Sequence, residues 1–447
     1  MLKSKFPKTN RIELSDQKVD NIWTFYSNIS TLHGAQHLKN ENKSYWQRIF
    51  WSIVIISALL STAYIQTLFL QRFIERPLVT SLQRDYYTWN TTFPSFTLCS
   101  QRKMNETALQ IHLREMNLPR HSMLKLEAFL RVLVNLTMYN LDSLSKFGDF
   151  KSPIVMQVIE KLTNKYDYDV LIDSVPSFKL QRTMTELGIC DQFNSELSQI
   201  FATDFLISDR LPAQKPLFEI NYFDTSSHIV LNDLDDSNIH IHGPFELPQY
   251  LQKREISGSV SQYKSFTLTA TTIVARQNVR ALFISHRKCR YVDESDLSHF
   301  PSMYAFDLCK IECRIKAIIE RCKCVPFFYK KLPHETYCNA KQLLCVELLK
   351  DDINEATKSC ECYQLCTNVK FGIQGVNSLN WLQNNKLRME LSKPKMRLIR
   401  EALHSYTDVV AAIGATFCLF LGASILTVVE IIYLGFLHCF KKQFKTE

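Results

Sequence analysis

Two long apolar stretches dominate the pattern of hydrophobic and polar positions along the chain. Residues 49–70 form 22 consecutive positions without a charge, interrupted only by uncharged polar side chains. At about 1.5 Å per residue, this stretch is long enough to cross a bilayer as a helix. Residues 409–440 form a second stretch of 32 positions, long enough to cross while tilted or broken. The pattern therefore predicts two membrane-spanning segments.

The second stretch contains three consecutive small residues, Gly422, Ala423 and Ser424, followed by its only formal charge, Glu430. Small residues allow close backbone approach or a break in the helix. A charge in such a segment is costly and by default marks a functional site. In a pore, carbonyls and the Ser424 hydroxyl could approach a cation, and Glu430 could attract it. The alternative is ordinary helix packing, with Glu430 at the inner interface.

The cysteines indicate where the segment between the two stretches lies. The chain has 14 cysteines, and 12 of them fall between Cys99 and Cys366. An even, clustered set of this kind indicates an oxidising compartment. The same segment carries three N-glycosylation sequons, at Asn90, Asn105 and Asn135. The middle of the chain is therefore expected to be extracellular and both tails cytosolic, which three lysines after the second stretch also favour.

This topology places the chain in the plasma membrane and divides it into five segments. We expect cytosolic tails at residues 1–48 and 438–447, transmembrane helices at residues 49–70 and 406–437, and an extracellular cysteine-rich domain at residues 71–405. The net charge of +9 is spread along the chain without the dense basic block of a nucleic-acid-binding protein. There is no nucleophile–base arrangement and no nucleotide-binding loop, so we expect neither an enzyme nor a cofactor.

Helical and strand patterns both occur in the extracellular segment, which predicts an α+β domain. Helical spacing is found at residues 104–147 (two or three helices), 152–163, 306–321 and 341–354. Alternation of β-branched or aromatic residues is found at residues 216–223, 265–274 and 279–284. We therefore expect a β core with helical excursions.

Ten of the cysteines lie within residues 289–366, and their spacing suggests a local ladder. Cys309 and Cys313 are four apart in a predicted helix, so they share one face about 6 Å apart. Cys360 and Cys362 are two apart in an expected extended segment, so they share one face about 6.6 Å apart. If the segments run antiparallel, two rungs could form, Cys309–Cys362 and Cys313–Cys360. A zinc site built from these cysteines is the alternative.

Several short motifs follow one another in a characteristic order. His33 and Gly34 precede the first apolar stretch, and FPSFTLC at residues 93–99 follows it. Next come LGICDQFN at residues 187–194, RKCRY at residues 287–291, the spaced cysteines Cys309 and Cys313, and finally Gly-Ala-Ser. This order, combined with two apolar stretches, resembles the degenerin/epithelial sodium channel family, most of all its insect pickpocket branch. The resemblance covers nearly the whole chain.

The resemblance implies a trimer whose subunits each have two transmembrane helices and a disulfide-rich ectodomain with palm, finger and thumb regions. It implies the disulfides Cys99–Cys190, Cys289–Cys366, Cys309–Cys362, Cys313–Cys360, Cys322–Cys345 and Cys324–Cys338. It assigns the selectivity filter to Gly422, Ala423 and Ser424, with Glu430 contributing to the pore. It assigns gating roles to His33 and Gly34, in a segment that re-enters the membrane, and to Ala411, where bulky residues hold degenerin channels open.

The chain departs from the family pattern just before the filter. Ala412 stands where many relatives have an aspartate, so one charge is missing from the outer vestibule. The acidic residues that sense protons in some relatives have no clear counterparts, so the resemblance does not imply proton gating.

The implied function is that of a pore-forming subunit of an amiloride-sensitive channel for sodium or monovalent cations, gated by an extracellular stimulus. Its partners would be sodium ions, the lipid bilayer and related subunits in a homo- or heterotrimer, with no nucleic acid and no metal cofactor. Two alternatives stay open: an ATP-gated type of two-span channel, and a non-conducting or auxiliary surface receptor subunit. The ATP-gated type needs a lysine cluster around a phosphate site, and its motifs are not found.

Overall fold

The computed structural model describes residues 34, 37 and 44–443, except residues 152–153, 155, 167, 173–174, 209–215, 224–227, 233–236, 249–254, 258–261, 381–385 and 394–395. The chain divides into two compact units. The first consists of Met1–Val79 with Ala402–Glu447, and the second of Thr80–Glu401. Both apolar stretches therefore belong to the first unit, and the sequons and clustered cysteines belong to the second.

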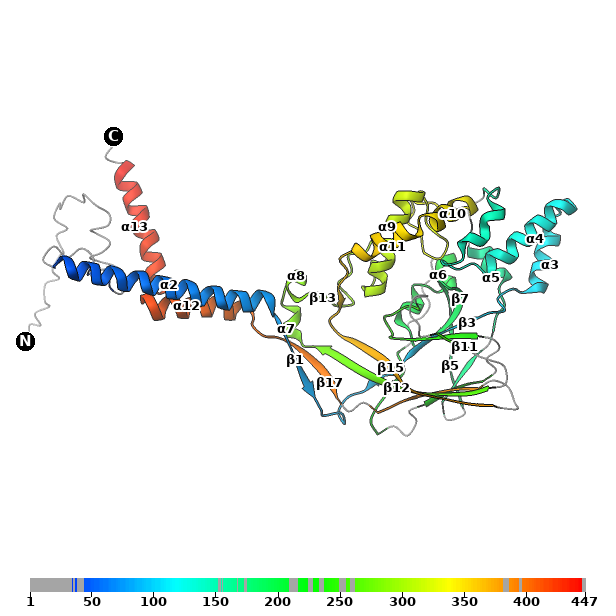
Figure 1. Ribbon diagram of the computed structural model, residues 1–447, viewed down its shortest axis with the longest axis horizontal. Helices are drawn as coiled ribbons and strands as arrows, with labels where there is room; N and C mark the ends of the chain where they lie inside the picture. Colours follow the sequence, from blue (N-terminus) through cyan, green and yellow to red (C-terminus); the bar gives the residue numbers. More distant parts are fainter. Residues whose placement is uncertain are drawn as a thin grey trace, which may run out of the picture. The chain divides into compact units, whose positions relative to one another are not determined.

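Three long helices lie in the first unit (Figure 1): α2, Tyr45–Glu75; α12, Tyr406–Leu421; and α13, Ile425–Gln443. α2 and α12 run side by side, and Gln66 of α2 donates a hydrogen bond to the hydroxyl of Thr416 on α12. α2, with 31 residues, is by itself long and apolar enough to cross a membrane. Helices α12 and α13 meet this criterion only as a pair, bent by 76° at the break between them.

The second unit contains two sheets whose inner faces share one apolar core. The larger sheet comprises β1 (Leu78–Gln83), β17 (Arg397–Ala402), β12 (Gln262–Ala275), β16 (Lys386–Leu391), β9 (His228–Asn232), β4 (Asp169–Ile172) and β5 (Val175–Lys179) in that order, with β15 (Asn368–Asn380) also paired to β12. The smaller antiparallel sheet comprises β11 (Glu255–Ser257), β10 (Ser237–His242), β3 (Ser95–Ser100), β7 (Gly188–Phe193) and β6 (Gln181–Thr185). Alternate residues such as Phe266 and Leu268 of β12 enter the shared core with Phe96 and Leu98 of β3.

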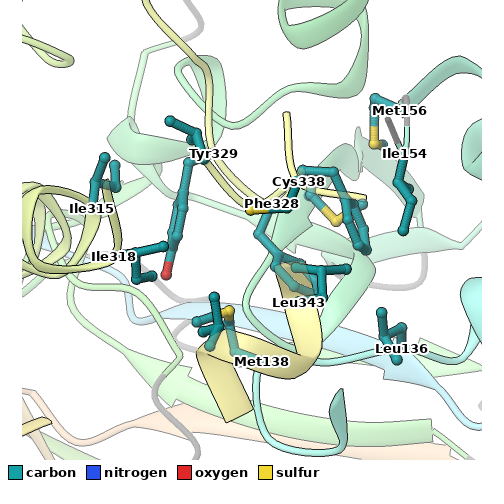
Figure 2. Close-up of a cluster of buried hydrophobic side chains, with 14 of the residues drawn as sticks. Leu136, Met138, Ile154, Met156, Ile315, Ile318, Phe328, Tyr329, Cys338 and Leu343 are labelled. Carbon is teal, nitrogen blue, oxygen red and sulfur yellow. The ribbon is translucent and has the colours of Figure 1, made fainter. Parts of the chain in front are cut away.

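Helices form a second core in this unit, around α9 (Phe306–Cys322). The other helices of this core are α3 (Glu106–Glu115), α4 (Arg120–Val134), η2 (Leu141–Phe147), α5 (Met156–Leu162), η3 (Glu196–Gln199), α6 (Thr203–Ser208), α10 (Ala340–Leu348) and α11 (Lys350–Ser359). Two short helices, α7 (Gln277–Arg280) and α8 (Ile284–Arg287), contribute no residue to it. Figure 2 shows Ile315 and Ile318 of α9 gathered with Phe328, Tyr329 and Leu343. Two short pairs, β2 (Thr91–Thr92) with β8 (Glu219–Ile220) and β13 (Cys289–Arg290) with β14 (Gln364–Leu365), complete the strands of the described residues.

Most of the expected helices are present, but one expected strand is wrong. Residues 279 and 280 end α7, residue 284 begins α8, and residues 281–283 form a turn between the two helices. Val279 and Leu282 are both buried and lie three positions apart, which is the spacing of a helical turn. So short an apolar run cannot be distinguished from strand alternation by its pattern. The strand expected at residues 216–223 is limited to β8, and the helix expected at residues 341–354 is two helices that meet at Leu349.

Six disulfides join the twelve cysteines of the second unit, in the pairs that the resemblance implies: Cys99–Cys190, Cys289–Cys366, Cys309–Cys362, Cys313–Cys360, Cys322–Cys345 and Cys324–Cys338. The ladder on α9 is therefore present. The zinc alternative is wrong, because its four sulfurs are bonded to one another in pairs. The segment opposite α9 is a tight turn rather than a strand, since the Cys362 N–H donates to the Cys360 carbonyl at 3.0 Å.

Removing the Cys309–Cys362 rung as a pair should reduce surface expression less than removing either cysteine alone. In the double variant Cys313–Cys360 still closes almost the same loop, so most of the roughly 4 kcal/mol of constraint expected for such a loop is kept. A single substitution instead leaves a thiol beside an intact disulfide that it can attack. Surface biotinylation of Cys309→Ser, Cys362→Ser and the double variant measures the difference.

The matched comparison is the double variant Cys99→Ser/Cys190→Ser. These cysteines are 91 positions apart, and none of the other five disulfides closes that loop. We expect this variant to be retained inside the cell. Wild-type surface levels of both single variants, Cys309→Ser and Cys362→Ser, would contradict the expected cost of an orphan thiol.

Candidate functional site

The second apolar stretch is interrupted at Gly422, Ala423 and Ser424, which separate α12 from α13. Gly422 ends α12 with a φ of +64°, in the left-handed region that favours glycine. Its N–H donates to the Cys418 carbonyl at 2.9 Å, and the N–H of Ala423 donates to the Phe417 carbonyl at 3.3 Å. The three small residues therefore break the helix and turn the chain sharply.

Ser424 begins the next helix by capping it. Its Oγ accepts a hydrogen bond from the Thr427 N–H at 3.3 Å, and Thr427 Oγ1 accepts one from the Ser424 N–H at 3.1 Å. This reciprocal arrangement satisfies early N–H groups of α13 with hydroxyl oxygens. Thr427 is a residue of the break that sequence reasoning missed, and the Ser-x-x-Thr spacing before an apolar run is the signal that could have revealed it.

The break also exposes carbonyl groups at the end of α12. In a continuous helix, the N–H groups of Ala423 and Ser424 would donate to carbonyls four positions earlier. Here the Ala423 N–H donates to the Phe417 carbonyl, and the Ser424 N–H donates to Thr427 Oγ1. The carboxyl end of a helix carries partial negative charge because its last carbonyls lack intrahelical partners. The segment therefore presents oxygen atoms of the kind that replace water around a cation.

Two faces of α12 differ in what they contact. The Ala412 carbonyl and the Thr416 hydroxyl both accept hydrogen bonds from Gln66, so this face packs against α2. A second face consists of the small residues Ala411, Gly414, Ala415 and Cys418 and is exposed in the single chain, as are the larger side chains beside it. Glu430 is partly buried on α13, six positions beyond Ser424, or about 9 Å along a helix.

Gly34 lies against the apolar part of α2. Its φ is +85°, and a Cβ atom there would lie 3.3 Å from Trp51 and 3.4 Å from Ile55. The His37 N–H donates to the Gly34 carbonyl at 3.0 Å, and the His37 ring centroid lies 4.4 Å from that of Trp51. Gly34 and His37 thus both lie against Trp51 of α2, and the backbone of Gly34 favours glycine. His33 lies outside the described residues.

The three sequon asparagines lie at the surface of the second unit. Asn90 and Asn135 are exposed, and Asn105 is partly exposed. Asn105 also caps α3, because its side chain accepts a hydrogen bond from the Ala108 N–H at 2.9 Å. A glycan on the nitrogen of this side chain would leave the capping oxygen in place.

Known proteins similar to this chain are sodium channels. A family model described as amiloride-sensitive sodium channel matches residues 26–434. Sodium channel protein Nach of Drosophila melanogaster is 22% identical over 480 residues, covering 95% of this chain and 88% of the relative. Nach of Drosophila ananassae is 21% identical over 479 residues, covering 94% and 90%. Pickpocket protein 11 of Drosophila melanogaster is 26% identical over 179 residues, covering 35% and 34%.

These matches and the six disulfides define the class of protein: a membrane protein with a disulfide-rich ectodomain. The chain belongs to the amiloride-sensitive sodium channel family, which is the degenerin/epithelial sodium channel family. Its similarity to the Nach and pickpocket proteins places it in the insect branch. This is a family of ion channels whose members assemble as multimers, and it is not a family of enzymes.

The ectodomain also contains a buried ion pair that no sequence motif reveals. Glu186, in the turn between β6 and β7, pairs with Arg314 of α9. Glu186 also accepts hydrogen bonds from the hydroxyls of Tyr139 at 2.8 Å and Tyr329 at 2.6 Å. Burial is the largest influence and lowers the pKa of Arg314, but Glu186, Tyr329 and Tyr139 together outweigh it and raise the pKa, so the guanidinium stays charged. Removing one partner of such a pair leaves the other charge buried, which typically costs about 3–5 kcal/mol.

Asp307, near the start of α9, is a second buried acid. Burial raises the pKa of Asp307 to about 7, although the Leu247 N–H, which donates to its carboxylate at 2.8 Å, opposes the shift. The nearby Glu246 and Glu186 carboxylates raise the pKa further. Asp307 therefore changes charge near neutral pH.

Asp307 should make the ectodomain less stable as pH rises from about 4 to about 7. Over this window the folded state holds the Asp307 proton and the unfolded state does not, so raising the pH favours unfolding. The effect is on the order of 2–4 kcal/mol and is complete above the folded pKa. Asp307→Asn cannot ionise and keeps an oxygen for the Leu247 N–H, so it should gain stability relative to wild type as pH rises.

The measurement is the apparent Tm of the purified full-length chain between pH 4.5 and 8, at one scan rate, for wild type and Asp307→Asn. Asp142→Asn, an exposed carboxylate on η2, is the control and should shift Tm equally at all pH values. A constant Tm difference between Asp307→Asn and wild type across this range would show that Asp307 does not titrate there.

Proposed function

We propose that this chain is a pore-forming subunit of an amiloride-blocked channel for sodium or monovalent cations, opened by an extracellular stimulus. Helix α2 and the broken α12–α13 pair would be its two spans in the plasma membrane. Residues 71–405 would lie outside the cell and both tails inside. Membership of the sodium channel family supports this assignment.

The break at Gly422, Ala423 and Ser424 is the observation that carries the proposal. Lipid offers no hydrogen-bond partners, so irregular backbone at membrane depth is tolerated only where protein or a water-filled cavity satisfies it. The carbonyls at the end of α12 and the capping hydroxyl of Ser424 suit a water-filled pore and a partly dehydrated cation. We infer that these three residues form the selectivity filter and that Glu430 attracts cations beside it.

We further propose that three chains surround the pore. The exposed face of α12 made of Ala411, Gly414, Ala415 and Cys418 has the small side chains that let membrane helices approach closely. Because a different face of α12 contacts α2, this face is left for the α12 helices of other subunits. The tail segment at His33 and Gly34 would line the inner end of the pore, supported by the fit of Gly34 against Trp51.

Ala411→Val should produce a larger constitutive current than wild type at equal surface expression. If α12 helices meet at Ala411 in the closed state, two extra methyl groups per subunit do not fit, and the closed state loses stability. Whole-cell current in unstimulated cells, alone or with sibling subunits, measures this. Ala411→Ser is the control, because its small side chain should leave the current unchanged. Unchanged or smaller current in Ala411→Val would rule out a gate at this level.

Substitutions of Ser424 and Glu430 should change ion selectivity and conductance. The valine of Ser424→Val and the threonine of Ser424→Thr have side chains of nearly the same shape, but only threonine keeps the hydroxyl that caps α13. We therefore expect Ser424→Val to admit potassium more readily than Ser424→Thr. Glu430→Gln removes up to three charges from a weakly screened pore and should lower unitary cation conductance severalfold without blocking surface expression.

Reversal potentials in mixed sodium and potassium, together with single-channel currents, measure these effects in an assembly known to conduct. Glu355→Gln, the same chemical change on the exposed surface of α11, is the control and should leave both quantities unchanged. If the Ser424 and Glu430 variants all match wild type, these residues serve helix packing and the pore assignment fails. Absence of current with every sibling subunit would favour a non-conducting role.

A further inference from the structure

His299, in the loop before α9, is enclosed by two carboxylates that come from different segments. Its Nδ1 lies 2.8 Å from Oε2 of Glu312 on α9, and its Nε2 lies 3.0 Å from Oε2 of Glu335 in the loop after α9. The side chain of His299 is 2% exposed, and both glutamate side chains are buried as well. One imidazole ring therefore joins three segments at a site that water barely reaches.

The geometry of this triad fixes the charge of the histidine. A neutral imidazole has one N–H donor and one nitrogen with a lone pair, whereas the imidazolium has two N–H donors. An ionised carboxylate only accepts hydrogen bonds, so a neutral His299 ring would turn a lone pair toward Glu312 or Glu335. Only the imidazolium satisfies both contacts, and His299 therefore carries a positive charge in this structure.

Two further charged side chains lie beside the triad. Lys316 Nζ is 3.2 Å from Oε1 of Glu312, and His334 Nε2 is 3.9 Å from Oε1 of Glu335. Both side chains are mostly exposed, so water and salt screen them. Burial is the largest influence on Glu312 and raises its pKa, but His299 and Lys316 together outweigh it and lower the pKa to about 2. Glu312 is therefore ionised near neutral pH and has no proton to donate to the ring.

The same carboxylates also hold the backbone of both loops. Glu312 Oε2 accepts a hydrogen bond from the His299 N–H at 3.1 Å, and Glu335 Oε2 accepts one from the Leu332 N–H at 2.8 Å. The two loops line a cavity of about 720 Å³ near Lys330, whose other walls come from the start of α5 and from α6. The triad thus fixes the backbone of the loops before and after α9 where they border this cavity.

We propose that His299 is a charged joint that holds these two loops against α9 and releases them in alkaline surroundings. On deprotonation the ring loses one N–H donor, and a lone pair then faces a buried carboxylate. A buried charge without its partner is costly, so the loop concerned moves toward water. The joint does not depend on whether the chain conducts, so it is tested separately from the proposed pore.

The direction of the effect follows from the surroundings of the ring. Burial is the largest influence and lowers the pKa of His299, but the hydrogen bonds and charges of Glu312 and Glu335 together outweigh it and raise the pKa. The stabilisation by the imidazolium is therefore complete below the ordinary histidine pKa of about 6.5 and is lost as the pH rises through the raised value of the folded state. The joint is closed in acid and opens in alkali.

The test is hydrogen exchange of the purified full-length chain, measured by mass spectrometry between pH 6.5 and 9.5, with exchange times scaled for the intrinsic base-catalysed rate. The amides of His299 and Leu332 report directly, because each donates to a carboxylate of the triad. Peptides that contain them should lose protection at least about tenfold across this range, since hydrogen bonds to charged groups are strong. Peptides of α4 are the internal reference and should keep their protection.

Two substitutions separate the charge of His299 from its packing. His299→Gln is neutral at every pH, so both loops should exchange at least about tenfold faster than wild type at pH 6.5 and lose no further protection at pH 9.5. His334→Gln removes the exposed histidine beside Glu335 and should follow wild type.

The wild-type profile needs no substitution, so a His299→Gln chain that fails to fold leaves the test intact. Constant wild-type protection of both loops between pH 6.5 and 9.5 would overturn the proposal. A folded His299→Gln chain that keeps the wild-type pH dependence would overturn it as well, because another group would then be responsible.

Discussion

Helix α9 is the element on which the ectodomain depends, because covalent and ionic contacts fix it on several sides at once. Disulfides tie it to residues 345, 360 and 362, which follow it in the chain. Its Arg314 pairs with Glu186 of the smaller sheet's β6–β7 turn, and its Asp307 accepts a hydrogen bond from Leu247. Any displacement of α9 would have to move all these segments or leave a buried charge without its partner, which is costly.

The same helix connects the parts of the ectodomain that differ in chemistry. Its apolar side chains, such as Ile315 and Ile318, fill the helical core (Figure 2). Its Glu312 pairs with His299 and so holds the loop that precedes α9.

The helices of the first unit bury little of their surface within the single chain. Only 6% of the most apolar window of α2 is buried within the chain, and Gln66 supplies its polar contacts to α12. Interhelical hydrogen bonds in membranes contribute only about 0.6–2 kcal/mol. Large apolar side chains such as Val410, Leu419 and Ile425 are exposed. Lipid and further chains must cover these surfaces, as expected of a family whose members are multimers.

Local sequence determined the features that depend on neighbouring residues. Apolar length predicted α2, three small residues predicted either close packing or the break at Gly422, and the four-residue spacing of Cys309 and Cys313 predicted the ladder on α9. These follow from the fixed rise and period of a helix. The full set of disulfide partners followed only from the family resemblance, since spacing alone leaves thousands of pairings.

Tertiary structure alone decided the rest. Residues 279–284 became the end of α7, a turn and the start of α8, with Val279 and Leu282 buried, which their short pattern does not specify. The ion pair of Glu186 with Arg314 joins positions 128 residues apart, and the cavity near Lys330 is enclosed by four separate segments. Such contacts depend on how sheets and helices pack, and side-chain spacing along the chain carries no information about distances between segments that only folding brings together.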